Sequence, residues 1–219
     1  MHLLGVRIGA DDVASAVRAY ATLLDVPPTA LPAGGARFRL GRGSVDVVGG
    51  PAGLQALRLA RAPDEAALEA AYGVAVTTEA APDDIAPGPA SVAIDHVVVR
   101  TTDPGRAIAL WRDRLGLRLA LDREFPARGL RLLFLRSAGM TLEYAAPLPP
   151  ASGPALDDAL YGMSYRVTDL AARRDRLLAA GIDVSQPRPG MRPGTTVVTV
   201  RSATAGVPTL LLEVDPPAQ

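Results

Sequence analysis

Two stretches of the chain repeat one arrangement of residues that can bind a metal ion. In the first stretch His96 begins an apolar strand-like segment and Glu143 closes a later one. In the second stretch Gly162 stands at the position of His96, and Glu213 closes the last strand-like segment. One imidazole and two carboxylates suit a divalent cation such as Fe²⁺, Mn²⁺, Zn²⁺, Co²⁺ or Ni²⁺. The two copies therefore predict most of a metal site, with a glycine in place of a further ligand.

Strand alternation places other polar residues beside these candidates. His96 shares its face with Arg100, and Gly162 shares its face with Ser164 and Arg166. Arg100 and Arg166 are equivalent by the repeat. They can form salt bridges at the rim, or hold a carboxylate or phosphate of a substrate in bidentate geometry. We therefore expect Arg100, Gly162, Ser164 and Arg166 to line a substrate-binding surface.

The elements that must position these residues recur four times. Each segment starts with an apolar strand and then reaches an Asp that fits a helix N-cap. The four cap residues are Asp12, Asp64, Asp103 and Asp169. A large side chain follows each Asp by about two helical turns and is expected to pack on the sheet. These side chains are Tyr20, Tyr72, Trp111 and Leu177. Strands follow each helix, so each unit reads β-α-β-β-β, with the second unit truncated, which predicts an α+β fold.

Loops rich in Ala, Asp and Pro divide the chain. We expect an N-terminal half at residues 1–90 and a C-terminal half at residues 91–219. The four units are predicted at residues 1–52, 53–90, 91–147 and 155–215.

The amino-acid composition excludes several kinds of chemistry and partner. The 219 residues are 48% hydrophobic, enough to bury a core, and contain no cysteine, which excludes disulfides and thiolate metal sites. All 23 basic residues are arginine and balance 23 acidic residues, so the net charge and basic stripe typical of nucleic-acid binding are missing. The absence of lysine excludes Schiff-base chemistry.

Two features that the sequence lacks indicate where the protein is located in the cell. No apolar run approaches the length of a membrane span, and the N-terminal residues lack the layout of a signal peptide. We expect a soluble cytoplasmic monomer or homodimer that binds a small molecule and has no nucleic-acid or membrane partner.

The pattern resembles the vicinal oxygen chelate superfamily, which includes glyoxalases, bleomycin-resistance proteins and extradiol dioxygenases. The segments that carry the resemblance are 94–99, 111–117, 141–143, 169–170, 179–184 and 211–213. The resemblance implies that paired β-α-β-β-β units curl into half-open barrels, two in this chain. It also implies a divalent metal inside a barrel, held by residues of the first and last strand of each unit.

Carried over to this chain, the resemblance implies His96, Glu143 and Glu213 as metal ligands, with Gly162 leaving room for substrate or water. In the N-terminal half the corresponding positions hold Gly5, Val47 and Leu57, and the last strand of the second unit is expected to be lost. That half is therefore expected to lack a metal site and to pack against the other half or cover its substrate.

Three functions remain open. The first is a metal-dependent lyase, isomerase or epimerase resembling glyoxalases, in which Glu143 leaves the metal to act as general base. The second is a metal-free protein that binds or sequesters a small molecule, as resistance proteins of the superfamily do. The third is an extradiol-type dioxygenase, ranked lower because Gly162 replaces a histidine. We favour an enzyme.

Overall fold

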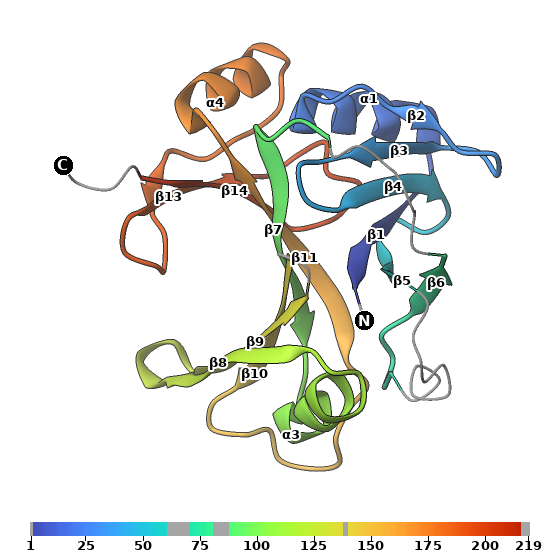
Figure 1. Ribbon diagram of the computed structural model, residues 1–219. Coiled ribbons are helices and arrows are strands. Elements are labelled where there is room, and N and C mark those ends of the chain that lie inside the picture. Colours follow the sequence, from blue (N-terminus) through green and yellow to red (C-terminus); the bar gives the residue numbers. More distant parts are fainter. Residues whose placement is uncertain (1, 61–70, 81–87, 138–139, 216–219) are drawn as a thin grey trace.

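The computed structural model describes residues 2–60, 71–80, 88–137 and 140–215, which form two β-sheets and a few helices (Figure 1). The expected α+β class is confirmed. The first sheet has the strand order β2-β3-β4-β1-β5-β6. Its elements are β1 (Leu3–Ala10), helix α1 (Val13–Leu24), β2 (Thr29–Ala30), β3 (Ala36–Arg39), β4 (Ser44–Gly49), β5 (Gly53–Ala60) and β6 (Val76–Glu79).

The second sheet has the strand order β12-β13-β14-β11-β7-β10-β9-β8. Its elements are β7 (Val92–Arg100), α3 (Pro104–Ile108), the π-helix η1 (Ala109–Arg114), β8 (Arg118–Phe125), the 3₁₀-helix η2 (Pro126–Arg128), β9 (Leu130–Ser137), β10 (Met140–Pro147), β11 (Ala159–Val167), α4 (Leu170–Ala179), β12 (Arg188–Pro189), β13 (Thr195–Val200) and β14 (Thr209–Val214). None of the described helices combines the length and the apolar composition that crossing a membrane requires.

Both sheets follow one pairing rule. The first strand of each unit lies parallel to its last strand, as β1 does to β4, β7 to β10 and β11 to β14. Two units then join through their antiparallel first strands, β1 with β5 and β7 with β11. The second sheet ends in β8 and β12, which do not pair with each other, so it is half-open as expected.

The second unit keeps a strand that we expected it to lose. Strand β6 lies parallel to β5, with Val76 opposite Leu57, in the place that the last strand takes in the other units. The expectation that this last strand is missing is therefore wrong. Fifteen residues, 61–75, connect β5 to β6. The predicted cap at Asp64 lies outside the described residues.

The other expected helix caps are confirmed. The carboxylates of Asp12, Asp103 and Asp169 accept hydrogen bonds from first-turn backbone amides of α1, α3 and α4. The side chains expected on the sheet are buried at Tyr20, Trp111 and Leu177. Tyr72 departs from this rule, since it is 37% exposed and the Arg106 guanidinium lies 4.4 Å from its ring centroid. The backbone of Tyr72 has φ +51°, in the left-handed region, so the chain turns at this residue.

One hydrophobic core joins the two sheets. It contains Val6 and Leu57 of the first sheet and Val97 and Tyr165 of the second. Helices α1 and α4 lie side by side above it (Figure 1), and Arg173 of α4 donates to the carbonyl oxygen of Leu23 at 3.2 Å. Each sheet gives one face to this core, so their other faces, which we call the open faces, point away from each other. The N-terminal half therefore packs against the C-terminal half; the boundary at residues 90 and 91 stays a prediction.

An ionic cluster fills the open face of the first sheet. Arg58, 1% exposed, donates to both carboxylate oxygens of Glu79 at 2.7 Å and to Ser44 Oγ at 2.7 Å. Asp46, also 1% exposed, accepts from Arg58 at 3.3 Å and from Arg37 through two bonds of 2.7 Å. Two guanidinium groups and two carboxylates thus neutralise one another, which leaves no carboxylate of the cluster free for a ligand.

The pairing register of the strands corrects two positions in the N-terminal half that we expected to match metal-ligand positions of the C-terminal half. Asp46 pairs with Arg7 on the open face, whereas Val47, the position expected to match Glu143, is fully buried in the core. Leu57 is likewise buried in the core, and its neighbour Arg58 takes the open face. Successive strand residues face opposite ways, so an error of one residue exchanges a core side chain for an open-face one.

We predict that Arg58→Met lowers the free energy of unfolding by about 3 kcal/mol, because it leaves the buried Asp46 and the half-buried Glu79 short of a cation. Urea unfolding measures this. The control is Arg112→Met, which removes a half-exposed arginine paired with Asp113 and should leave the midpoint unchanged. Equal midpoints for Arg58→Met and the unmodified protein would refute a stabilising role for the cluster.

Candidate functional site

A β-bulge brings two neighbouring side chains of β7 to the same face. Ser164 of β11 pairs with His96, but Tyr165 pairs with Ile94, so Asp95 is the extra residue of a bulge. Ile94 is buried in the core, whereas Asp95 and His96 are both half-buried on the open face. The bulge therefore places a carboxylate beside an imidazole on one side of the sheet.

Glu143 completes this group from the neighbouring strand β10. The imidazole Nδ1 of His96 lies 2.9 Å from Asp95 Oδ2, and its Nε2 lies 3.6 Å from Glu143 Oε2. We call Asp95, His96 and Glu143 the acid–base cluster. The structure thus brings His96 and Glu143 together and adds Asp95, which we did not predict. Regular alternation places Asp95 on the core face, and the sequence carries no signal for the bulge that moves it.

The cluster perturbs the pKa values of all three groups. Burial raises the pKa of Glu143, the charge of His96 lowers it, and that of Asp95 raises it, with a net increase. Burial lowers the pKa of His96, but the hydrogen bond to Asp95 and the charges of Glu143 and Asp95 raise it above its ordinary value. Burial raises the pKa of Asp95, yet the hydrogen bond from His96 and the charges of His96, Arg166 and Arg192 hold it low. The raised pKa of His96 favours its protonated form, the lowered pKa of Asp95 favours its carboxylate, and the raised pKa of Glu143 makes its carboxylate a stronger base.

The structure places Glu213 away from this group. Leu211 of β14 pairs with Tyr165 and both are buried in the core, so Glu213, two residues on, shares the core face. Its carboxylate accepts hydrogen bonds from the backbone amides of Asp169 at 2.7 Å and Leu170 at 3.3 Å, at the start of α4. Glu213 therefore contributes to helix capping.

The space beside Gly162 is also taken. A Cβ atom at this position would lie 2.8 Å from the carbonyl oxygen of Pro208, the backbone of the adjacent strand connection. The same carbonyl accepts a hydrogen bond from the amide of Met163 at 2.9 Å. Gly162 therefore allows close packing of the backbone, and the expectation that it leaves room for substrate or water on its Cβ side is wrong.

The side chains present do not fit a resident divalent metal. Catalytic metal sites commonly use three protein ligands, whereas here only His96 and Glu143 of the expected set converge. In the described part of the chain, no group of three or more His, Asp or Glu side chains is arranged to hold a metal ion. The mechanism below therefore uses no metal.

The remaining expected residues line the same open face. Arg166 Nε lies 3.8 Å from Asp95 Oδ1, so its positive charge borders the cluster. Ser164 is directly opposite His96. Arg100 lies at the far end of β7, with its guanidinium 3.5 Å from the ring centroid of Tyr161, and it borders a hollow of about 370 Å³.

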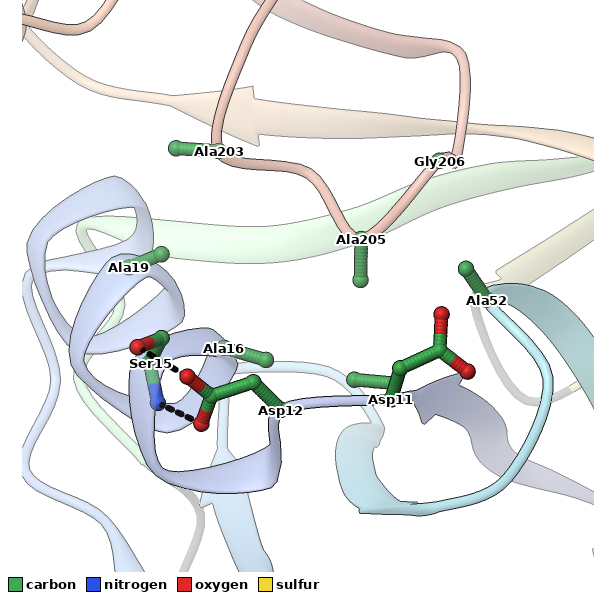
Figure 2. A pocket seen from close by; sticks show the side chains of 10 residues that line it. Asp11, Asp12, Ser15, Ala16, Ala19, Ala52, Ala203, Ala205 and Gly206 are labelled. Atoms are coloured by element: carbon green, nitrogen blue, oxygen red, sulfur yellow. Dashed lines mark hydrogen bonds between the residues drawn. The ribbon is translucent and has the colours of Figure 1, made fainter.

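A second hollow, of about 390 Å³, lies apart from the acid–base cluster, between the start of α1 and the loop 203–206 (Figure 2). Its lining is mostly alanine, and Figure 2 shows the carboxylate of Asp12 turned back to Ser15, where it caps α1. None of the expected site residues lines this hollow. Among the described residues, the acid–base cluster therefore lies apart from this hollow, on the open face of the second sheet.

We predict that His96 titrates above the ordinary value of 6.5, and that Glu143→Gln lowers its pKa by removing a negative neighbour. NMR of protein labelled in the histidine ring measures both, with the His96 signal assigned by its loss in His96→Gln. The control is Glu124→Gln, which removes the charge of an exposed carboxylate on β8 and should leave the titration unchanged. A His96 pKa at or below 6.5, or a His96 pKa that Glu143→Gln does not change, would contradict the geometry.

The chain is similar to several known proteins. A curated ethylmalonyl-CoA/methylmalonyl-CoA epimerase from Cereibacter sphaeroides is 29% identical over 99 residues, which cover 42% of this chain and 72% of that protein. A methylmalonyl-CoA epimerase structure from Mycobacterium tuberculosis is 23% identical with a TM-score of 0.46, covering 56% of this chain and 88% of that one. A hypothetical protein from Bacillus halodurans C-125 is 22% identical with a TM-score of 0.47, covering 59% and 99%.

The family comparison covers most of the second sheet. Residues 95–199 match the family described as Glyoxalase/Bleomycin resistance protein/Dioxygenase superfamily. This segment contains Asp95, His96 and Glu143, together with β8 to β13. The resemblance predicted from the sequence is therefore confirmed over residues 95–199, which are similar to this superfamily.

Proposed function

We propose that the open face of the second sheet is the active site of an epimerase- or isomerase-type enzyme that removes a proton next to a carbonyl group. The observation that carries the proposal is the acid–base cluster, in which His96 Nε2 lies 3.6 Å from Glu143 Oε2. The similarity to a curated epimerase supports the same class.

Glu143 is the base in this proposal. Its raised pKa makes its carboxylate a stronger base than an exposed glutamate, closer to the operating pH. When it takes the proton from carbon, the electrons of the broken C–H bond move to the carbonyl oxygen and form an enolate. Return of this proton to the same face restores the substrate, whereas a proton delivered from water to the opposite face gives the epimer, and Glu143 then passes its own proton to water, which regenerates the carboxylate.

His96 and Asp95 set the charge of the site. The hydrogen bond from Nδ1 to Asp95 orients the imidazole and favours its protonated form. A protonated His96 stabilises the negative charge that appears on the enolate and can supply a proton to it. Arg166 and Arg192 add positive charge near Asp95, which favours an anionic substrate.

The lining of the face favours a small acyl compound. Phe134 pairs with Glu143 across β9 and β10, and Leu210 pairs with Ser164 across β11 and β14. Apolar side chains thus flank the acid–base cluster on both sides. An acyl thioester that carries a carboxylate, such as the substrate named for the curated relative, combines the carbonyl, the acidic carbon and the negative charge that this face suits.

We predict that the protein exchanges the acidic proton of methylmalonyl-CoA with deuterium from D₂O, and that Glu143→Gln slows this exchange by about 100-fold or more. Mass spectrometry of the thioester measures the rate. Glu124→Gln is the matched control and should keep the rate. Addition of EDTA should leave it unchanged, because the proposed proton transfer uses protein side chains without a metal.

Two outcomes would contradict the proposal. A lack of exchange by the unmodified protein, despite measurable binding of the thioester, would favour the alternative of a non-catalytic binding protein. A loss of exchange on chelation, restored by a divalent metal, would favour the metal-dependent version that the superfamily resemblance implies.

A further inference from the structure

Ser164 has a buried hydroxyl group without a hydrogen-bond partner among the described residues. The residue is 1% exposed, and within the described residues its Oγ atom has no hydrogen-bond partner. Buried hydroxyl groups in folded proteins nearly always have a partner, so one without a partner indicates a contact made by something else. Neither the acid–base cluster nor the helix caps involve this hydroxyl.

The hydroxyl lies beside the acid–base cluster. Ser164 is the direct antiparallel partner of His96, and side chains of such a pair have Cβ atoms about 4.5–5.5 Å apart on the same face. Arg166, two residues further along β11, lies on the same face and borders Asp95. A substrate held against His96 and Glu143 therefore passes within reach of this donor.

The first sheet shows what a larger residue does at the same register position. In the first sheet Arg58 pairs with Gly5, and a bulge lies just before Gly5. In the second sheet Ser164 pairs with His96, and the bulged residue Asp95 lies just before His96, so Arg58 and Ser164 hold equivalent positions. The Arg58 guanidinium reaches across the open face and is fully engaged by Glu79, Asp46 and Ser44. Ser164, although buried, makes no such contact with the described residues.

We propose that the Ser164 hydroxyl donates a hydrogen bond to the substrate carbonyl oxygen, the atom that becomes the enolate oxygen. This inference rests on the proposed proton transfer. As Glu143 takes the proton from carbon, the electron pair moves to that oxygen, and a hydrogen bond to the resulting anion is stronger than one to the neutral carbonyl. Ser164 therefore stabilises the enolate more than the bound substrate, as preorganised donors of oxyanion sites do.

The test measures deuterium exchange of methylmalonyl-CoA in three variants. Ser164→Ala should lower kcat by about 100-fold, since one oxyanion donor is lost. KM should stay within about threefold, because the contact matters most in the transition state. Ser164→Thr keeps a hydroxyl and should retain most of the rate, whereas its isostere Ser164→Val should resemble Ser164→Ala. None of these losses should come from unfolding, since Ser164→Ala removes an unpartnered group and should not lower the thermal midpoint.

The outcomes separate this inference from the proposed function. Exchange that Glu143→Gln abolishes but Ser164→Ala leaves intact would overturn the role of Ser164 alone. Equal kcat values for Ser164→Thr and Ser164→Val would do the same, because then the hydroxyl is irrelevant. A lack of exchange by the unmodified protein would overturn both.

Discussion

The antiparallel pairing of β7 with β11, with Asp95 bulged out of it, is the constraint on which the site depends. It joins two β-α-β-β-β units into one sheet and sets which side chains leave the core. Without the extra residue, alternation would turn either Asp95 or His96 into the core. With it, the carboxylate orients the imidazole, and the parallel neighbour β10 brings Glu143 to the other ring nitrogen. Backbone pairing thus determines the chemistry.

The two sheets share one pattern of strand pairing but carry different side chains on their open faces. In the first sheet Arg58 and Arg37 neutralise Asp46 and Glu79, so that its open face is occupied by its own side chains. In the second sheet the equivalent of Arg58 is Ser164, and the carboxylate of Glu143 has no arginine bonded to it within the described residues. The charged side chains on the open face of the first sheet therefore pair with one another, whereas those of the acid–base cluster on the second sheet are the ones that we propose for chemistry.

Periodic patterns in the sequence predicted many of the helices and strands. The pairing register of the strands decided which face of a sheet each side chain takes. Asp caps, apolar strands and the spacing of the repeat predicted the helices and the two sheets, and they placed His96 and Glu143 at the site. Glu213 shows where such prediction fails. It lies two residues after Leu211, whose side chain is in the core, so Glu213 is on the core face of β14, where its carboxylate caps α4. Asp95 was missed because a bulge has no sequence period. The backbone carbonyl of Pro208, which fills the space at Gly162, could be located only in three dimensions.

The pH dependence of deuterium exchange in the unmodified protein and in Asp95→Asn tests the acid–base cluster most directly. The rate should rise as Glu143 loses its proton, above its ordinary pKa of 4.5, and fall as His96 loses its proton, above 6.5. Asp95 raises the pKa of both groups, so Asp95→Asn should move both limbs to lower pH while exchange continues. Limbs that stay in place, or an acid limb at or below pH 4.5 in the unmodified protein, would contradict the account.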